Sequence, residues 1–207
     1  ATPTPSLGWR YPLDDFGLPF SPRDPDQLSL GPDGSFVAVG YTLAEAREGF
    51  FYDGHVLLLN IDGCLTGVSS WDRPVVDLTV LPDGSGAILG VSRPVSSEGL
   101  VDLRTIEYEQ DEPESRRVAL VSSQGESVWT SVSEGVTGLK LSADGRRLIV
   151  TFSDVVRLVD PDDGRIIWEW DAPRTVTAIG IGEDGSKVAV GTQAGVHLLE
   201  TDGSVAW

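Results

Sequence analysis

A short unit of strand, tight turn and strand occurs four times in this chain. In each copy an Asp-Gly pair separates two arms along which apolar residues alternate with small or polar ones, as in 178–192 (AIGIGEDGSKVAVGT). Such alternation indicates strands, and the glycine supplies the positive φ that a tight hairpin needs. The other copies lie at 28–40 (LSLGPDGSFVAVG), 78–90 (LTVLPDGSGAILG) and 139–152 (LKLSADGRRLIVTF). A meander repeated four times predicts an all-β fold made of similar sheets.

The spacing of the turn aspartates gives the size of the repeat. Asp33, Asp83, Asp144 and Asp184 follow one another at intervals of 50, 61 and 40 residues. The shortest interval is close to the roughly 40–45 residues of a four-stranded propeller blade. The longer intervals contain insertions at 42–53 and 93–116. We therefore predict a Thr/Pro-rich linker at 1–6 and a single domain at 7–207, with repeats at about 27–71, 75–132, 136–170 and 175–207 and an additional strand at 7–11.

A second signature follows the turn between the third and fourth strands. A glycine is followed four residues later by a tryptophan in the pairs Gly125 and Trp129, Gly164 and Trp168, and Gly203 and Trp207. The pattern resembles PQQ-type repeats and the related WD40-like and YVTN-like β-propeller repeats, in which this segment docks the tryptophan of one blade against its neighbour. The first repeat departs from the pattern, because Gly63 is followed by Cys64 and its tryptophan comes only at Trp71.

The resemblance implies an all-β, four-bladed β-propeller, or four blades of a larger propeller, built from four-stranded antiparallel blades. Trp9 and Tyr11 have the spacing of Trp168 and Trp170, and the last repeat reaches Trp207 within its fourth strand. We therefore expect segment 7–11 to complete the last blade. A strand from the same chain would close the ring, whereas a strand from a neighbouring chain would make a head-to-tail contact that can extend into a filament. The residues predicted for this terminal-strand contact are Leu7, Trp9, Tyr11, Val205 and Trp207.

Long connections are predicted to gather on one side of the propeller. The insertions 42–53 and 93–116 join second to third strands, and 12–26 joins an outer strand to the next inner one. Loops on a rigid scaffold often carry binding, and exposed apolar patches often mark partners. The aromatic side chains of this long-loop face are Phe16, Phe20, Phe50, Phe51, Tyr52 and Tyr108. They predict a protein-interaction surface, with the alternative that they fold back and cap the ring.

The first strand of each repeat separates apolar from small or polar positions. The apolar set is expected to pack blade on blade and comprises Leu28, Leu30, Leu78, Val80, Leu139, Leu141, Ile179 and Ile181. The small or polar set is expected to lie in the crowded region near the propeller axis. There we expect Asp77 and Lys140 to be able to form an ion pair.

Charge and composition limit the partners and the chemistry. The net charge is −17, so nucleic acid and anionic membranes are poor partners. Cys64 is the single cysteine and excludes an intrachain disulfide, and no apolar run is long enough to span a bilayer. His55 and His197 lack a second ligand at metal-binding spacing, and the turn at Asp160 lacks the glutamate that a calcium loop requires. No catalytic, phosphate-binding or dinucleotide motif is present, so we expect no enzyme activity, cofactor or metal.

Together these patterns predict a non-catalytic propeller that acts as a structural or protein-interaction subunit, and that self-assembles if its terminal strand is exchanged. The Met-free sequence and its opening segment 1–6 (ATPTPS) favour a processed, extracellular protein, with an excised fragment as the alternative. Two further alternatives are a fragment of a quinone-dependent dehydrogenase, implied by the tryptophan-docking turns, and a monomeric adaptor that binds a partner on its long-loop face.

Overall fold

The computed structural model describes residues 27–32, 34–47, 49–71, 75–82, 86–92, 116–132 and 136–207. Within these ranges the chain forms strands and turns and no helix, and therefore none with the length and hydrophobicity to cross a bilayer. The strands are β1 (Gln27–Leu30), β2 (Phe36–Arg47), β3 (Gly49–Asn60), β4 (Leu65–Trp71), β5 (Val75–Val80), β6 (Gly86–Ser92), β7 (Arg116–Ser122), β8 (Ser127–Val132), β9 (Gly138–Leu141), β10 (Leu148–Thr151), β11 (Val155–Val159), β12 (Ile166–Asp171), β13 (Val176–Ile181), β14 (Val188–Thr192) and β15 (Gly195–Leu199).

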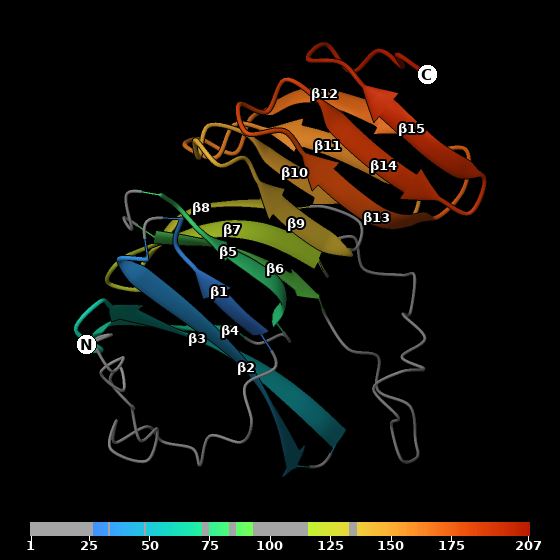
Figure 1. The fold of residues 1–207 in the computed structure, drawn as a ribbon. Coiled ribbons are helices and arrows are strands. Elements are labelled where there is room, and N and C mark those ends of the chain that lie inside the picture. The colour runs from blue at the N-terminus through green and yellow to red at the C-terminus, as the bar shows by residue number, and fades with distance from the viewer. Residues whose placement is uncertain are drawn as a thin grey trace, which may run out of the picture.

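The strands form antiparallel sheets in which each strand pairs with the next one in sequence. We call these sheets blade 1 (β1–β4), blade 2 (β5–β8), blade 3 (β9–β12) and blade 4 (β13–β15). In Figure 1 the blades follow one another in chain order, with blades 1 and 4 at opposite ends of the stack. The strands of each blade lie within one of the predicted repeats.

One predicted loop is wrong. Segment 42–53 is predicted as a long connection between the second and third strands, but β2 and β3 continue through it as a hairpin, in register from Phe36 opposite Asn60 to Arg47 opposite Gly49. Strand-forming aromatic residues in β3 pair with Ala44, Glu45 and Ala46, which have low intrinsic strand propensity. Cross-strand pairing overrides that local preference. The hairpin extends beyond the rest of blade 1 (Figure 1).

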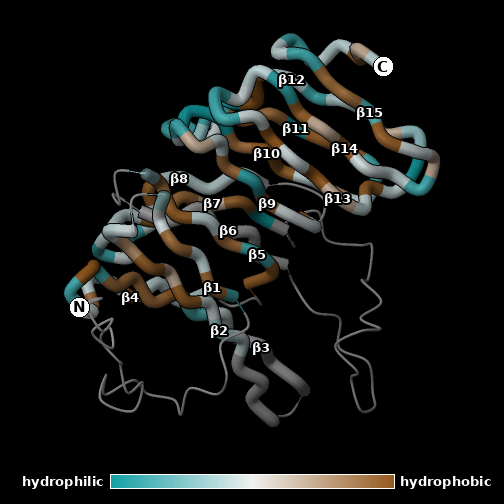
Figure 2. Tube along the Cα trace, viewed as in Figure 1, coloured by the Kyte–Doolittle hydropathy of each residue, from teal (hydrophilic) through white to brown (hydrophobic). Residues whose placement is uncertain are grey.

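The apolar cores lie between the blades. Successive side chains of a strand point to opposite faces, so each sheet has one face toward the preceding blade and one toward the following blade. Leu78 and Val80 of blade 2 pack against Ala38, Val56 and Leu58 of blade 1 in one core. Two further cores join blade 2 to blade 3 and blade 3 to blade 4. Figure 2 shows the apolar colouring along the strands and hydrophilic turns between them.

The predicted packing of first strands is confirmed for the inner interfaces. Leu78, Val80 and Leu139 are buried, and Leu141, Ile179 and Ile181 pack on the cores while partly exposed. Leu28 and Leu30 are instead strongly exposed. No blade precedes β1 in the described structure, so the apolar side chains at these positions remain in solvent.

The Asp-Gly turns between first and second strands also stack on one another. Gly145 has φ of 72°, and a Cβ at this position would overlap the ring of Pro82 in blade 2. In the next blade a Cβ on Gly185 would lie 2.5 Å from Cγ of Arg147, and the Asp144 amide donates to the Glu183 carbonyl at 3.2 Å. A Cβ on Gly34 of blade 1 would meet nothing within 4 Å. The turns of blades 3 and 4 thus contact the preceding blade, whereas the turn of blade 1 has no such contact, as is also true of the first strands.

Candidate protein-interaction site

The outer edges of blades 2 and 3 are joined by a tryptophan that packs on a glycine turn. Trp129 of β8 lies opposite Leu120 and contacts the turn of the following blade, where a Cβ on Gly164 would lie 2.9 Å from its Cε3 atom. The Trp129 Nε1–H donates to the Pro161 carbonyl of the same turn at 3.0 Å. The glycine therefore allows a flat aromatic ring to lie directly on the backbone.

Trp168 repeats this contact between blades 3 and 4. It lies opposite Leu158 and is buried, and a Cβ on Gly203 would lie 3.1 Å from its Cγ atom. Its Nε1–H finds no hydrogen-bond partner among the described residues. The blade 4 turn is one residue shorter, closing from Glu200 to Ser204 rather than from Asp160 to Arg165 as in blade 3. The shorter turn has no counterpart of the Pro161 carbonyl contact.

Blades 1 and 2 use a different outer contact, consistent with the departure noted in the first repeat. Gly67 occupies the tryptophan position, opposite Leu58, and the Gly125 turn of blade 2 packs on its backbone. Neither glycine has room for a Cβ, because backbone atoms of the other segment occupy the space. Trp71 lies further along β4 and donates its Nε1–H to the Ser69 hydroxyl at 3.0 Å. The sequence shows that the first repeat lacks a tryptophan at this position, but it did not predict the contact between Gly67 and Gly125.

Trp207 lies at the position of blade 4 that corresponds to Trp168 in blade 3. The Leu198 amide donates to its carbonyl at 2.9 Å, the Ala206 amide donates to the Leu198 carbonyl at 2.8 Å, and Val205 forms a bridge with Leu199. These bonds start an outer strand beside β15, as predicted. Trp207 is 68% exposed and Val205 is 50% exposed.

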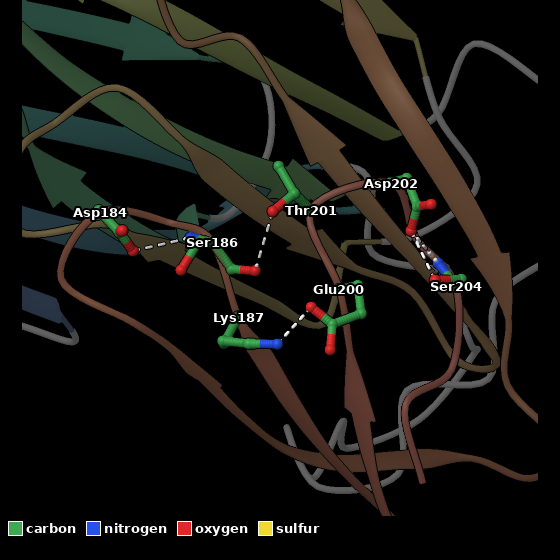
Figure 3. A network of polar contacts seen from close by, with 7 residues as sticks. All are labelled: Asp184, Ser186, Lys187, Glu200, Thr201, Asp202 and Ser204. Carbon is green, nitrogen blue, oxygen red and sulfur yellow. Dashed lines mark hydrogen bonds and ion pairs between the residues drawn. The ribbon is translucent and has the colours of Figure 1, made fainter.

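A network of polar residues holds the turn that leads to Trp207 (Figure 3). Asp202 accepts hydrogen bonds from the Ser204 amide and hydroxyl, which lower the pKa of its carboxyl. Lys187 pairs with Glu200, and the Thr201 hydroxyl donates to the Ser186 carbonyl at 3.2 Å. The Ser186 amide bonds to Asp184 at the neighbouring turn. These exposed contacts contribute little stability individually, but they fix the geometry of the turn.

The remaining predicted interaction residues are placed only in part. Leu7, Trp9, Tyr11, Phe16, Phe20 and Tyr108 lie outside the described residues. Phe50, Phe51 and Tyr52 belong to β3, and their side chains lie outside the description. The strand-exchange contact and the long-loop patch therefore stay predictions.

The inner edges of the blades are joined by side chains that bond to the next blade. The Gln27 amide donates to the Val76 carbonyl at 3.1 Å, and the Asp77 carboxylate accepts from the Leu139 amide at 2.7 Å. Burial raises the pKa of Asp77. Hydrogen bonds from the backbone amides of Leu139 and Leu78, and the positive charge of Lys140, oppose this rise. Asp77 and Lys140 form no ion pair in the described structure, because the two carboxylate oxygens bond instead to the amides of Leu78 and Leu139.

The histidines and the aspartates of the Asp160 turn, which were considered as metal ligands, make other contacts. His55 bonds through Nδ1 to the Ser70 hydroxyl at 2.9 Å, and the His197 ring stacks at an angle on Trp170. Asp160 and Asp163 cap their own turn by accepting amides of Asp162 and Arg165. The described residues contain no group of three or more His, Cys, Asp or Glu side chains arranged to hold a metal.

Comparison with known proteins identifies the architecture. No protein-family model matches the sequence, and no curated protein is similar to it. Among solved structures, the chain is similar to the Kuenenia stuttgartiensis hydrazine synthase, with a TM-score of 0.59 and 16% sequence identity. The match covers 95% of this chain and 52% of the hydrazine synthase chain, so this sequence spans about half of that length. The fold is a β-propeller. At this identity the likeness shows the propeller fold and no shared activity.

Proposed function

We propose that this chain is a non-catalytic, extracellular propeller that acts as a structural or protein-interaction subunit and assembles head to tail through its terminal outer strand. The observation that carries the proposal is the outer strand that segment 204–207 starts beside β15 of blade 4, where it pairs with Leu198 and Leu199. In blade 3 the outer strand pairs with β11 from Val155 to Val159, whereas segment 204–207 reaches along β15 only as far as Leu198. The extracellular location rests on the Thr/Pro-rich segment 1–6 alone.

The open part of β15 has the hydrogen-bonding groups that a strand needs. Alternate residues of an antiparallel strand direct their amide and carbonyl to opposite sides. Leu198 directs both groups outward to segment 204–207, so Val196, two residues earlier, presents its own pair along the same edge. An unpaired edge of this kind is a template for another strand. Segment 7–11, with its aromatic residues at outer-strand spacing, is the proposed occupant.

The test is the assembly state of the full chain and of two truncations. Size-exclusion chromatography with light scattering, together with negative-stain imaging, should show concentration-dependent oligomers for the full chain. Removal of residues 1–11 should abolish them, whereas removal of residues 1–6 is the matched control and should leave them intact. A full chain that stays monomeric at every concentration, or oligomers that survive loss of 1–11, would contradict strand exchange.

A further inference from the structure

The chain contains eight Asp-Gly pairs, and the structure describes the side chains of five of these aspartates. In such a pair the aspartate carboxyl can react with the backbone nitrogen of the glycine, since no glycine side chain hinders the approach. The five described aspartates are all exposed, each in a turn that follows a strand, and they are Asp62, Asp144, Asp163, Asp184 and Asp202. Exposure therefore does not distinguish the five, whereas their hydrogen bonds do.

Four of the five carboxylates are held by their own turn. Each accepts a hydrogen bond at 2.9–3.0 Å from the amide two residues further on, and the donors are Arg146, Arg165, Ser186 and Ser204. Bonds of this kind are characteristic of aspartate in turns. Hydrogen bonds are also the main cause of a lowered pKa at three of these aspartates, which are Asp144, Asp184 and Asp202. These carboxyls stay ionised and are therefore poor electrophiles.

Asp62 lacks such a bond because Asn60 takes the amide that would supply it. The Cys64 amide, two residues beyond Asp62, donates to the side-chain oxygen of Asn60 at 2.8 Å. The Asp62 amide donates to the same oxygen at 3.1 Å. In the described structure the Asp62 carboxyl itself has no hydrogen-bond or ion-pair partner. All of these contacts lie within one turn, so the difference does not depend on a neighbouring blade.

The turn at Asp202 is a close match to the turn at Asp62. In both turns the glycine amide donates to the carbonyl three residues earlier, at 2.9 Å for Gly63 and 3.0 Å for Gly203. The two glycines have similar positive φ values of 76° and 81°. After the glycine, however, Ser204 donates its amide and its hydroxyl to Asp202, whereas the Cys64 amide donates to Asn60. The two backbones are alike, and the hold on the carboxyl differs.

We propose that Asp62 and Gly63 form a site of spontaneous isoaspartate formation in the folded chain. The Gly63 nitrogen attacks Cγ of the protonated Asp62 carboxyl, a Cγ–N bond forms, and the carboxyl hydroxyl leaves with the amide proton as water. A water molecule then opens the cyclic imide. Cleavage of the new Cγ–N bond restores aspartate, whereas cleavage of the original peptide C–N bond leaves the chain linked through the Asp62 side chain. The reaction needs no reagent besides water, and it lengthens the backbone of the turn between β3 and β4 by one atom.

The test is ageing of the full folded chain at neutral pH in heavy-oxygen water, followed by proteolytic digestion and mass spectrometry. Opening of the imide adds one oxygen from the solvent, so each reacted site is labelled. Label and isoaspartate should accumulate at Asp62 about tenfold or more faster than at the other four described aspartates, because each of those must first lose a hydrogen bond to a charged group. The same chain unfolded in urea is the control, and there the five rates should become similar.

Two substitutions of Cys64 separate the effect of a hydrogen bond from that of losing the thiol. Cys64→Ser supplies the hydroxyl that Ser204 gives to Asp202, so it should lower the rate at Asp62 about fivefold or more. Cys64→Ala is the matched control and should react like the parent chain. Cys64 is exposed, so both variants should keep the circular dichroism spectrum of the parent chain.

Three results would contradict the assignment of this site. Equal rates at the five aspartates in the folded chain, or an Asp62 that stays unmodified, would overturn the proposal. So would a Cys64→Ser chain that reacts as fast as the parent chain, because the freedom of the carboxyl would then not control the site.

Discussion

The two faces of blade 4 differ in what covers them, although they belong to one sheet. The face toward blade 3 contains Val188, Val190 and Leu199, all buried in the core that also contains Leu158 and Trp168. The opposite face contains Ala189 and Val196, both exposed. Both faces consist of small and apolar side chains. Burial in this fold therefore comes from the adjacent blade and not from the sheet itself.

This difference explains where the stability of the chain resides. Each blade buries apolar area mainly on its neighbours, so an inner interface stabilises two blades at once, whereas an end face contributes little until it is covered. Pairs of variants, one at a buried position and one at an equivalent exposed position, test directly whether stability resides in the inner interfaces.

The largest expected difference is between Leu158→Ala and Leu198→Ala. The two leucines occupy the same register position, but Leu158 is fully buried and Leu198 is half-buried. Truncation of the buried leucine should lower the free energy of unfolding by about 2–5 kcal/mol, and that of the half-buried one by about 1 kcal/mol. Urea denaturation followed by circular dichroism, at low protein concentration, measures both. Equal losses would show that the face of blade 4 that contains Ala189, Val196 and Leu198 is already covered in the isolated chain.

A smaller difference is expected between Gly145→Ala and Gly34→Ala. Both glycines have positive φ, at 72° and 74°, so alanine costs about 1–2 kcal/mol of backbone strain at either position. Only the Cβ at position 145 also meets the rigid ring of Pro82 in the adjacent blade. We therefore expect Gly145→Ala to cost about 1–3 kcal/mol more than Gly34→Ala in the same denaturation measurement. A cost for Gly34→Ala that matched Gly145→Ala would mean that the turn of blade 1 also has a neighbour.

The sequence predicts the local elements of this molecule better than its interfaces. The Asp-Gly turns and the alternation in 178–192 locate strands correctly because both signals act within one hairpin. The glycine–tryptophan spacing also predicts the docking of Trp168 on the next turn, as the resemblance implied. The continuation of β2 and β3 through 42–53 was missed, since pairing between strands overrides the weak strand propensity of Ala44 and Glu45.

The exposure of the two end faces could not be predicted from residue types. Leu28 and Leu78 stand at equivalent positions with identical side chains, and only the presence of a preceding blade distinguishes them. The same holds for Val156 and Val196. Whether a repeat has a neighbour is a property of the assembled stack, and local sequence patterns do not contain it. The strand 7–11 and the aromatic long-loop residues stay predictions because these residues or their side chains lie outside the described part of the chain.

The smallest expected effect concerns pH at the inner edge of blades 2 and 3. Burial between the blades raises the pKa of Asp77 above its ordinary value of 3.8, so folding favours its protonated form. Its stabilising contribution is complete below pH 3.8 and is lost as pH rises through the raised pKa. The free energy of unfolding of the parent chain, minus that of Asp77→Asn, should therefore decrease between pH 3.8 and 7.

Asp144→Asn is a control of opposite sign at an exposed turn. Hydrogen bonds from Ser142 and Arg146 lower the pKa of Asp144, so its stabilising contribution is present above pH 3.8 and is lost as pH falls. Differences of the same sign for both variants would show that Asp77 is solvated and that the inner contact with Leu139 opens in solution.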